Sequence, residues 1–380
     1  MSQVCVECVK DKNIKKLIIK NGSKNTCTLC EEEHLSIDFE DRDFFSLVKA
    51  VLRFNFSEWE YNRHWGGDGL ECLFYGEDNV FFEQERALSE DIYEELVLSI
   101  TEGPAYEDYD KGISIFAGYG PDGMQNMLLE SIKSSSDISL VKLANRLKSE
   151  NYFKVEKELL KILAKFADVA KISLEKGATF YRARVGISDK KRSLGGGFET
   201  EYHFTPYTES AIGSPPPLMA SAGRINRPGV AFFYCATDKY TAVSEVRPHP
   251  GDQVSIGKFA LSNKAKIFNL SESQLLHFYS SDESLDTYIP LNTLSNFMNK
   301  VIPPSERQQY SFTQLIADCI RQMGFDGIMF NSTVGNGENI VLFDPSIVSY
   351  TNEDSEVVEV EQVKYTLETL KLISDDEIYS

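Results

Sequence analysis

An arginine, a tyrosine and a glutamate stand close together in residues 215–245, PPPLMASAGRINRPGVAFFYCATDKYTAVSE. Arg224 precedes a tight turn, and Tyr234 lies in a short apolar run that is typical of a buried strand. Glu245 falls near the end of a helix that the pattern predicts from about Lys239. This set contains no histidine or cysteine nucleophile. It suits a reaction in which a sugar-like centre becomes positively charged.

A second group of candidate residues lies in the predicted strand 178–185. Alternation puts Arg182 and Arg184 on one face and Tyr181 on the other. Two guanidiniums on a strand face are costly in a core unless they meet an anion, and arginine binds phosphate through paired hydrogen bonds. The pattern therefore favours a pyrophosphate site, with a surface salt-bridge pair as the alternative.

Four cysteines near the start of the chain have the spacing of a metal site. Cys5 and Cys8 form one CxxC pair and Cys27 and Cys30 a second, with 18 residues between the pairs. Four thiolates close a tetrahedral zinc site, so we expect a structural zinc knuckle, with a disulfide pairing as the alternative. The intervening segment predicts a hairpin with its turn at residues 21–22. Its lysines could contact nucleic acid, although a solvated surface is the simpler interpretation.

Hydrophobic periodicity predicts an α+β fold. A helical period recurs through the first half, in residues 43–52, 90–100, 137–149 and 153–171. Short strands and a few helices follow, so we expect a mixed domain with a central β core. The predicted division is a zinc knuckle at 1–35, a helical domain at 40–172, the mixed domain at 175–350 and an acidic C-terminal tail at 351–380. Arg63 with His64 and the glycine clusters at 66–69 and 118–121 are interpreted as structural.

Composition narrows the class of protein. The chain has 380 residues, seven cysteines and a net charge of −19. Such a charge disfavours nucleic acid as a general partner, the basic knuckle excepted. No run of 18 apolar residues and no secretory leader is found, and paired cysteines of this kind suit a reducing compartment. We therefore expect a soluble, cytoplasmic protein that does not enter the membrane.

Residues 175–350 resemble the RES domain family, which is named for its arginine, glutamate and serine. The blocks that carry the resemblance are Tyr181 to Arg184, the prolines 215–217, Gly223 to Asn226, Tyr234, Glu245, Asn331 with Ser332, and Asn339. The front half is similar to the N-terminal regions of some multidomain RES proteins, a HEPN-like helical domain among them.

The resemblance implies an ADP-ribosyltransferase-like fold and an enzyme that cleaves the nicotinamide–ribose bond of NAD, by hydrolysis or phosphorolysis. Many members are toxins of toxin–antitoxin pairs, so an inhibitory protein is an expected partner and a homo-oligomer is compatible with the family. Carried over by position, the catalytic residues are Glu245, Arg224, Tyr234 and Ser332. The substrate-binding residues are Arg182, Arg184, Tyr181, Asn226 and Asn339. We also expect the front half to sense a signal such as phage infection.

The residue chemistry supports the same assignment. A carboxylate close to the sugar stabilises an oxocarbenium-like state, and Glu245 is the candidate. Ser332 is expected to be a hydrogen-bond partner rather than a nucleophile, because no base adjoins it. Two other function classes remain: an ADP-ribosyltransferase acting on a macromolecule, and a zinc-knuckle binding module with an inactive domain. In an alternative without catalysis, Glu245 is a surface acid that forms an ion pair with Arg247.

Overall fold

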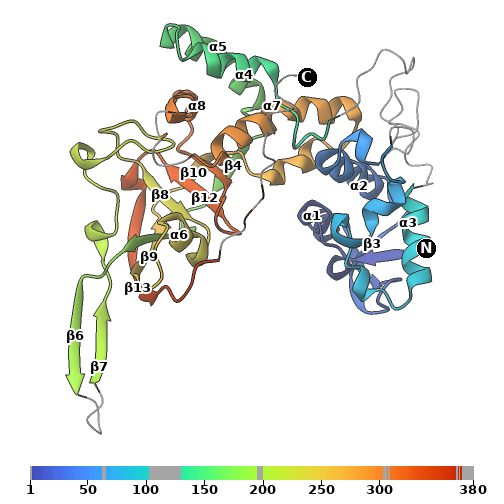
Figure 1. Cartoon of the computed structure of the whole chain (residues 1–380), viewed down its shortest axis with the longest axis horizontal. Helices are drawn as coiled ribbons and strands as arrows, with labels where there is room; N and C mark the ends of the chain where they lie inside the picture. The colour runs from blue at the N-terminus through green and yellow to red at the C-terminus, as the bar shows by residue number, and fades with distance from the viewer. Residues whose placement is uncertain are drawn as a thin grey trace, which may run out of the picture.

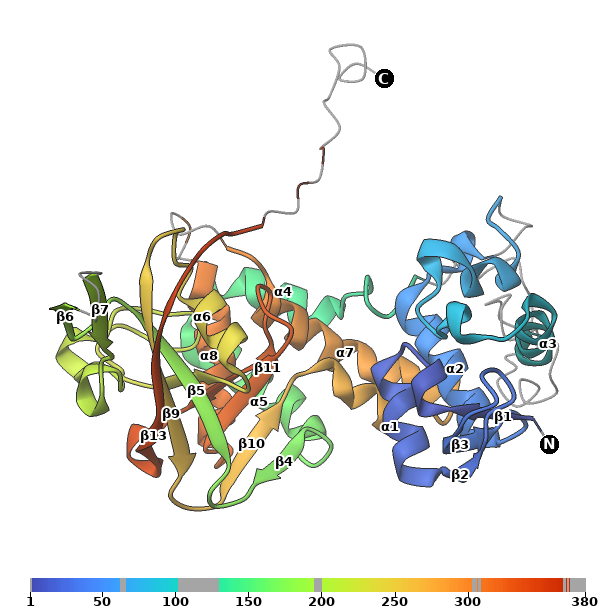
Figure 2. The same ribbon diagram turned by 90° about the horizontal axis from the view of Figure 1, so that it is seen from below.

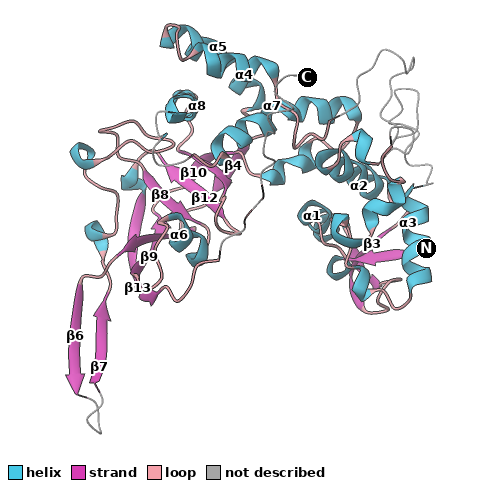
Figure 3. Ribbon diagram, in the orientation of Figure 1, coloured by secondary structure: helices cyan, strands magenta, loops and turns pink. Residues whose placement is uncertain are grey.

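The chain folds into a front part, shown in blue and cyan, and a larger sheet-containing part (Figure 1). The computed structural model describes residues 2–61, 66–101, 130–194, 200–302, 306, 309–364, 367 and 369. Arg63, His64 and the glycine cluster at 118–121 lie outside these residues. Helices and strands are both prominent, which confirms the predicted α+β class (Figure 3).

The front part begins with a small sheet of order β1-β3-β2. Its strands are β1 (Gln3–Cys5), β2 (Ser23–Thr26) and β3 (Glu33–Asp38). The predicted hairpin with its turn at residues 21–22 is wrong, because α1 (Lys12–Asn21) occupies that segment. The Asp11 carboxylate accepts hydrogen bonds from the amides of Asn13 and Ile14 and so caps the first turn. The buried side chains of α1 recur at helical spacing, a period that the hairpin prediction overlooked.

Four predicted helices of the first half are confirmed. They are α2 (Arg42–Asn55), α3 (Glu90–Thr101), α4 (Ile138–Arg146) and α5 (Tyr152–Phe166). Three begin at side chains that accept hydrogen bonds from first-turn amides: Asp41, Asp137 and Asn151. α5 ends earlier than predicted, since residues 171–174 pair with the large sheet instead.

The large sheet has eight strands in the order β13-β9-β5-β8-β12-β11-β10-β4. Neighbouring strands are antiparallel except β10 and β11, which are parallel. The strands are β4 (Lys171–Leu174), β5 (Thr179–Val185), β8 (Phe233–Ala236), β9 (Gln253–Leu261), β10 (Ala265–Asn269), β11 (Gly327–Asn331), β12 (Glu338–Leu342) and β13 (Val348–Glu359). Residues 351–359, predicted to start an acidic tail, are therefore part of the edge strand.

A two-stranded ribbon projects from the sheet part (Figure 1). It consists of β6 (Asp189–Leu194) and β7 (Thr200–Thr205), which pair in antiparallel register. The ribbon lies apart from the remaining helices, α6 (Lys239–Glu245), α7 (Asp282–Asn299) and α8 (Ser311–Gln322).

The large sheet buries apolar side chains on both faces. One cluster runs continuously from the small N-terminal sheet through the helices to β11 and β12. A second cluster packs on the other face around Phe180, Phe233 and Phe259. A third and much smaller set packs Ala242 of α6 against Ala183, Ala236 and Val254 of the sheet. Alanines at this contact let α6 sit close to the sheet, and this closeness sets the position of Glu245.

Helix α7 links the two parts of the chain (Figure 2). Its Asn292 side-chain amide donates to the Ile132 carbonyl at 2.7 Å, and its Thr293 hydroxyl accepts from the Asp137 amide at 2.8 Å. The C-terminal end of α7 reaches the sheet part beside Arg224, whose guanidinium donates to the Met298 carbonyl. One helix, with Pro290 inside it, thus connects the front part with the candidate site. Among the described helices, none has the length and apolar character needed to cross a membrane.

Candidate active site

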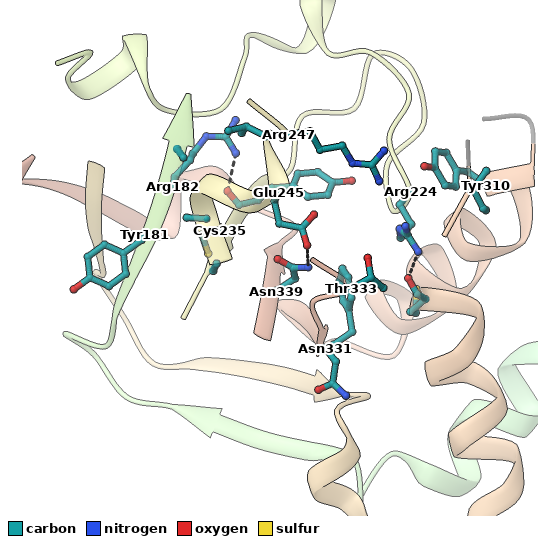
Figure 4. A pocket seen from close by; sticks show the side chains of 18 residues that line it. Tyr181, Arg182, Arg224, Cys235, Glu245, Arg247, Tyr310, Asn331, Thr333 and Asn339 are labelled. Carbon is teal, nitrogen blue, oxygen red and sulfur yellow. Dashed lines mark hydrogen bonds between the residues drawn. The ribbon is translucent and has the colours of Figure 1, made fainter. Parts of the chain in front are cut away.

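A cavity of about 440 Å³ opens between β5, β8, α6 and the end of α7. Six of the nine predicted catalytic and substrate-binding residues line it: Tyr181, Arg182, Arg224, Tyr234, Glu245 and Asn339. The volume falls within the range of small-molecule sites. Residues more than 150 positions apart in the sequence thus meet around one pocket, as Figure 4 shows.

Glu245 reaches the pocket because it is the last residue of α6. The Asp238 carboxylate caps this helix by accepting from the Thr241 amide at 2.8 Å. The helix then packs over the small alanines of β5 and β8 described above. Its length and its start therefore place Glu245 at the pocket.

Two donors hold a single oxygen of the Glu245 carboxylate. The Asn339 amide donates to Oε1 at 2.6 Å, and the Ser332 hydroxyl donates to the same atom at 2.8 Å. Asn339 lies directly beneath the carboxylate (Figure 4). Among the described residues, none donates to Oε2. One oxygen is thus fixed by the protein, and the other is available to a ligand.

Ser332 begins a turn that is tightly packed against α6. Its Oγ accepts hydrogen bonds from the amides of Val334 and Gly335, at 3.2 and 2.9 Å. The hydroxyl donates its one proton to Glu245 and accepts two hydrogen bonds, so its donor and both lone pairs are occupied. This fits a role in positioning Glu245. We call residues 331–338 the serine loop.

Glycine is required at position 337 of the serine loop. The Gly337 amide donates to the Thr241 hydroxyl at 3.0 Å, and a Cβ at this position would clash with the Asp238 carboxylate. The loop can therefore approach the first turn of α6 only with hydrogen as its side chain. The same contact fixes both ends of the Ser332–Glu245 hydrogen bond.

Arg224 is bound to the C-terminal end of α7. Its Nη1 donates to the carbonyls of Met298 and Lys300, the latter at 2.8 Å. A cation at this end is favoured by the helix dipole. Burial lowers the pKa of Arg224, and the charge of Arg247 lowers it further, while Tyr310 and Glu245 oppose this. Arginine remains protonated in such a setting.

The two arginines of β5 donate hydrogen bonds to backbone carbonyls. Arg182 donates from Nε to the Ile212 carbonyl at 2.8 Å and from Nη1 to the Tyr234 carbonyl at 2.6 Å. Burial lowers its pKa. Arg184 donates to the Ala211 carbonyl and lies 4.4 Å from the centre of the Tyr207 ring, away from the pocket wall. Arg182 thus contributes positive charge to the pocket wall while its donors hold neighbouring loops.

The Tyr234 ring lines the pocket, but its hydroxyl faces the loop that carries Arg224. The hydroxyl donates to Asn226 Oδ1 at 2.7 Å and accepts from the Ile225 amide at 3.2 Å. Burial raises the pKa of Tyr234 to about 12. Asn226 is itself buried and donates to three backbone carbonyls, so it lies behind the pocket wall. Together these groups fix the loop from Gly223 onward.

Sequence reasoning missed Arg247 as a pocket residue. Its side chain is exposed and extends across the pocket towards Arg224 (Figure 4). It forms no ion pair with Glu245 or with any other described residue, and its φ of 48° is unusual for a non-glycine residue. The turn after α6, held by a hydrogen bond from the Arg247 amide to the Ser244 carbonyl, aims this side chain inward. The only sequence signal was its position two residues after Glu245.

The four cysteines of the front part converge on one point. Their sulfur atoms all lie within 4.8 Å of one another, with Cys5 and Cys30 3.8 Å apart. All four are free, so the alternative of a disulfide is absent from these described residues. The contact with Cys8, together with backbone amides, lowers the pKa of Cys27 to about 4, which favours a thiolate. Four convergent sulfurs fit a tetrahedral metal ion.

Comparison with known proteins identifies the domain that contains the pocket. Residues 197–368 match the family described as the RES domain, which confirms the resemblance. The match starts after β5 and so leaves out Arg182. The crystal structure of the M. tuberculosis MbcT–MbcA toxin–antitoxin complex is similar at 12% identity and a TM-score of 0.28, over 52% of this chain and 92% of that chain. No curated protein matches the chain.

The hydroxyl of Tyr234 generates a first prediction. Tyr234→Phe leaves Asn226 Oδ1 and the Ile225 amide without their partner in a buried loop. We expect the free energy of unfolding, measured by urea denaturation, to fall by about 1–3 kcal/mol. The matched control is Tyr240→Phe on the exposed side of α6, where the change should stay within about 0.5 kcal/mol. Equal losses in both variants would contradict this assignment.

Proposed function

We propose that this chain, whose residues 197–368 are a RES domain, cleaves the bond between nicotinamide and ribose in NAD. The observation that carries the proposal is the Glu245 carboxylate, held through Oε1 alone by Ser332 and Asn339. Its second oxygen is left for a ligand in a pocket that is also lined by three arginines. The RES domain supports NAD as the substrate, and the pocket supports a reaction at a sugar carbon.

Glu245 would act by stabilising positive charge on the ribose. The carbon–nitrogen bond breaks with its electron pair passing to the nicotinamide nitrogen, which leaves as a neutral base. The ribose then carries oxocarbenium-like charge, and a fixed carboxylate oxygen close to it lowers the barrier. An oxygen of water or phosphate bonds to the same carbon, and water releases one proton to the solvent. Because the leaving group is neutral, the step needs no strong general acid.

Arg247 and Arg224 would hold the diphosphate of the dinucleotide. Arg224 keeps part of its guanidinium on the carbonyls at the end of α7, so it is fixed in place. Arg247 is exposed and unpaired among the described residues, so its donors are available. Arginine suits this role because its planar donors match phosphate oxygens. This differs from the sequence analysis, in which the strand pattern favoured Arg182 and Arg184 as the pyrophosphate ligands.

The decisive test is NAD consumption without any added acceptor. We expect Glu245→Gln and Glu245→Ala to lose about 100-fold or more in kcat, the usual cost of removing a fixed electrostatic group. Nicotinamide release, followed by chromatography, measures the rate. Glu201→Gln on the projecting ribbon is the matched control and should retain the wild-type rate. Equal rates for wild type and Glu245 variants would overturn the proposal. Cleavage that starts only when a macromolecule is added would identify an ADP-ribosyltransferase instead.

A second substitution tests the phosphate contact. Arg247→Ala removes a charged donor that binds ground state and transition state alike, so KM for NAD should rise about 10- to 100-fold with little change in kcat. Arg247→Lys should recover part of the loss, since the charge remains but the paired donors do not. Arg192→Ala, on the ribbon, serves as the control. A fall in kcat at constant KM would argue against a phosphate ligand.

We further propose that Cys5, Cys8, Cys27 and Cys30 hold a structural zinc ion. The convergence of their sulfurs supports this, as does the absence of an open ligand position in a four-cysteine set. The Arg86 guanidinium interacts with Cys8 and Cys30, and this positive charge would offset the excess negative charge of four thiolates. The ion would join the end of β1 and the turn after it to the connection between β2 and β3.

Zinc content and stability test the metal proposal. Cys27→Ser should lower zinc, measured by atomic emission, from about one ion per chain to well below one. Structural zinc binding is worth about 10–16 kcal/mol in small finger domains, so the front part should also unfold at a clearly lower temperature. Cys72→Ser, at an exposed cysteine outside the cluster, should change neither quantity. Wild-type protein without zinc would refute the assignment.

Removal of NAD would harm the host cell, so we propose that the chain is a toxin or defence effector held inactive by a protein partner. The open mouth of the pocket, with Arg224, Arg247 and Tyr310 around it, would be the surface to cover. Isolation of the chain from its native cells should then yield a second polypeptide that slows NAD cleavage. Full activity in the isolated complex would argue against inhibition.

A further inference from the structure

Thr241 lies in the first turn of α6, four residues before Glu245 at the end of the same helix. Its side chain is completely buried, and it does not line the candidate active site. Thr241 is also not among the residues that carry the family resemblance. A residue buried in this way cannot touch a substrate, so any effect that it has on the reaction must pass through its neighbours.

The Thr241 hydroxyl makes one hydrogen bond as a donor and one as an acceptor. It donates to Asp238 Oδ2 at 2.7 Å and accepts from the Gly337 amide at 3.0 Å. The other Asp238 oxygen accepts from the Thr241 amide at 2.8 Å, so this carboxylate is itself held in place. Because its proton is committed to Asp238, the hydroxyl presents a lone pair to the serine loop in a fixed direction. Valine has the same shape but offers no acceptor.

The peptide group of Gly337 connects Thr241 with Ser332. The Gly337 amide donates to Thr241, and the Gly337 carbonyl accepts from the Ser332 amide at 3.1 Å. The Ser332 hydroxyl then donates to Glu245 Oε1 at 2.8 Å. Since Thr241 and Glu245 belong to one helix, these bonds form a closed path from α6 through the serine loop and back to α6. Removal of the Thr241 hydroxyl opens this path at its start.

Two further contacts show how the serine loop is held on α6. A Cβ at Gly335 would clash with the Thr241 side chain, so the loop lies directly against this residue. At the end of the loop, the Thr237 amide donates to the Glu338 carbonyl at 3.0 Å, and the Thr237 hydroxyl accepts from the Glu338 amide at 3.0 Å. Pairing of Asn339 in β12 fixes the backbone that follows. Thr237 thus holds the end of the loop, and Thr241 holds the part to which Ser332 is bound.

We propose that Thr241 is a positioning residue, whose hydroxyl holds the serine loop so that Ser332 keeps Glu245 Oε1 in place during NAD cleavage. The inference rests on the proposed function. A carboxylate stabilises a developing cation best when its position is fixed in advance. Without the hydroxyl, Ser332 moves away and Asn339 alone holds the carboxylate. The rate of bond cleavage then falls, while NAD binding is unchanged because Thr241 does not line the pocket.

Nicotinamide release by full-length variants tests the role of the hydroxyl. Thr241→Val should lower kcat about 5- to 20-fold and leave KM for NAD within about twofold of wild type. Thr241→Ser keeps the hydroxyl and should recover most of the rate. The matched control is Thr351→Val in β13, which also loses a hydroxyl hydrogen bond, to the Lys258 carbonyl, and should keep the wild-type kcat. Circular dichroism confirms that each variant is folded.

Double substitutions identify the path by which Thr241 acts. In the Ser332→Ala background, Thr241→Val should have no further effect on kcat, because the loop no longer carries the donor. In the Asn339→Ala background it should still lower kcat. Gly337→Ala disturbs the same contact from the loop side, since its Cβ would clash with the Asp238 carboxylate. It should reproduce the kinetics of Thr241→Val, and it serves as the test if that variant does not fold.

Three kinetic outcomes would overturn the inference. A rise in KM at constant kcat would mean that Thr241 shapes the binding of NAD. An equal fall in kcat for Thr241→Val and Thr241→Ser would show that the hydroxyl is not the group that matters. Losses that add fully in the double substitution with Ser332→Ala would show that Thr241 acts by another path.

Hydrogen–deuterium exchange of the serine loop gives a readout that does not depend on catalysis. The Gly337 amide and its neighbours should exchange faster in Thr241→Val than in wild type, because a hydrogen bond to the loop is lost. Thr241→Ser and Thr351→Val should exchange as wild type does. If wild type cleaves no NAD, the proposed function fails, while the exchange still decides whether Thr241 holds the loop. Unchanged exchange in Thr241→Val would overturn the inference even if kcat falls.

Discussion

The pocket depends on one constraint, the fixing of a single carboxylate oxygen of Glu245. Ser332 and Asn339 both donate to Oε1, so the carboxylate cannot rotate without losing two hydrogen bonds. An exposed glutamate at a helix end would otherwise sample several rotamers. Preorganisation of this kind is what makes a charged group effective near a developing cation, because no reorganisation is needed during the reaction.

The packing of the serine loop against α6 places the two donors next to the Glu245 carboxylate. Alanines beneath α6 bring the helix close to the sheet, and Gly337 brings the loop close to the first turn of α6. Thr241 joins the two, since its hydroxyl accepts from the Gly337 amide and donates to Asp238. The carboxylate and its donors are therefore set by one connected group of small or hydrogen-bonded residues. A larger side chain at any of these positions would separate Glu245 from Ser332.

Sequence patterns predicted the type of most elements and the residue at the centre of the site. Glu245 was placed at a helix end because the period of α6 and its cap are local features. The hydrogen bonds of Arg182 could not be predicted from the sequence. Its partners, the carbonyls of Ile212 and Tyr234, come near it only in the folded domain. Arg247 was missed because a left-handed backbone turns it inward. The hairpin prediction near Gly22 was wrong because it relied on the Asn21–Gly22 turn pair. The helical spacing of the apolar residues before that pair was the correct signal.

Helix α7 joins the front part to the wall of the pocket. Arg224 is bound to the carbonyls at the C-terminal end of this helix, and Asn292, further along it, is bound to the segment that follows the front part. Tyr234 and Asn226 restrain the other side of Arg224. The position of this arginine is therefore set jointly by the end of α7 and by the loop that Tyr234 and Asn226 hold.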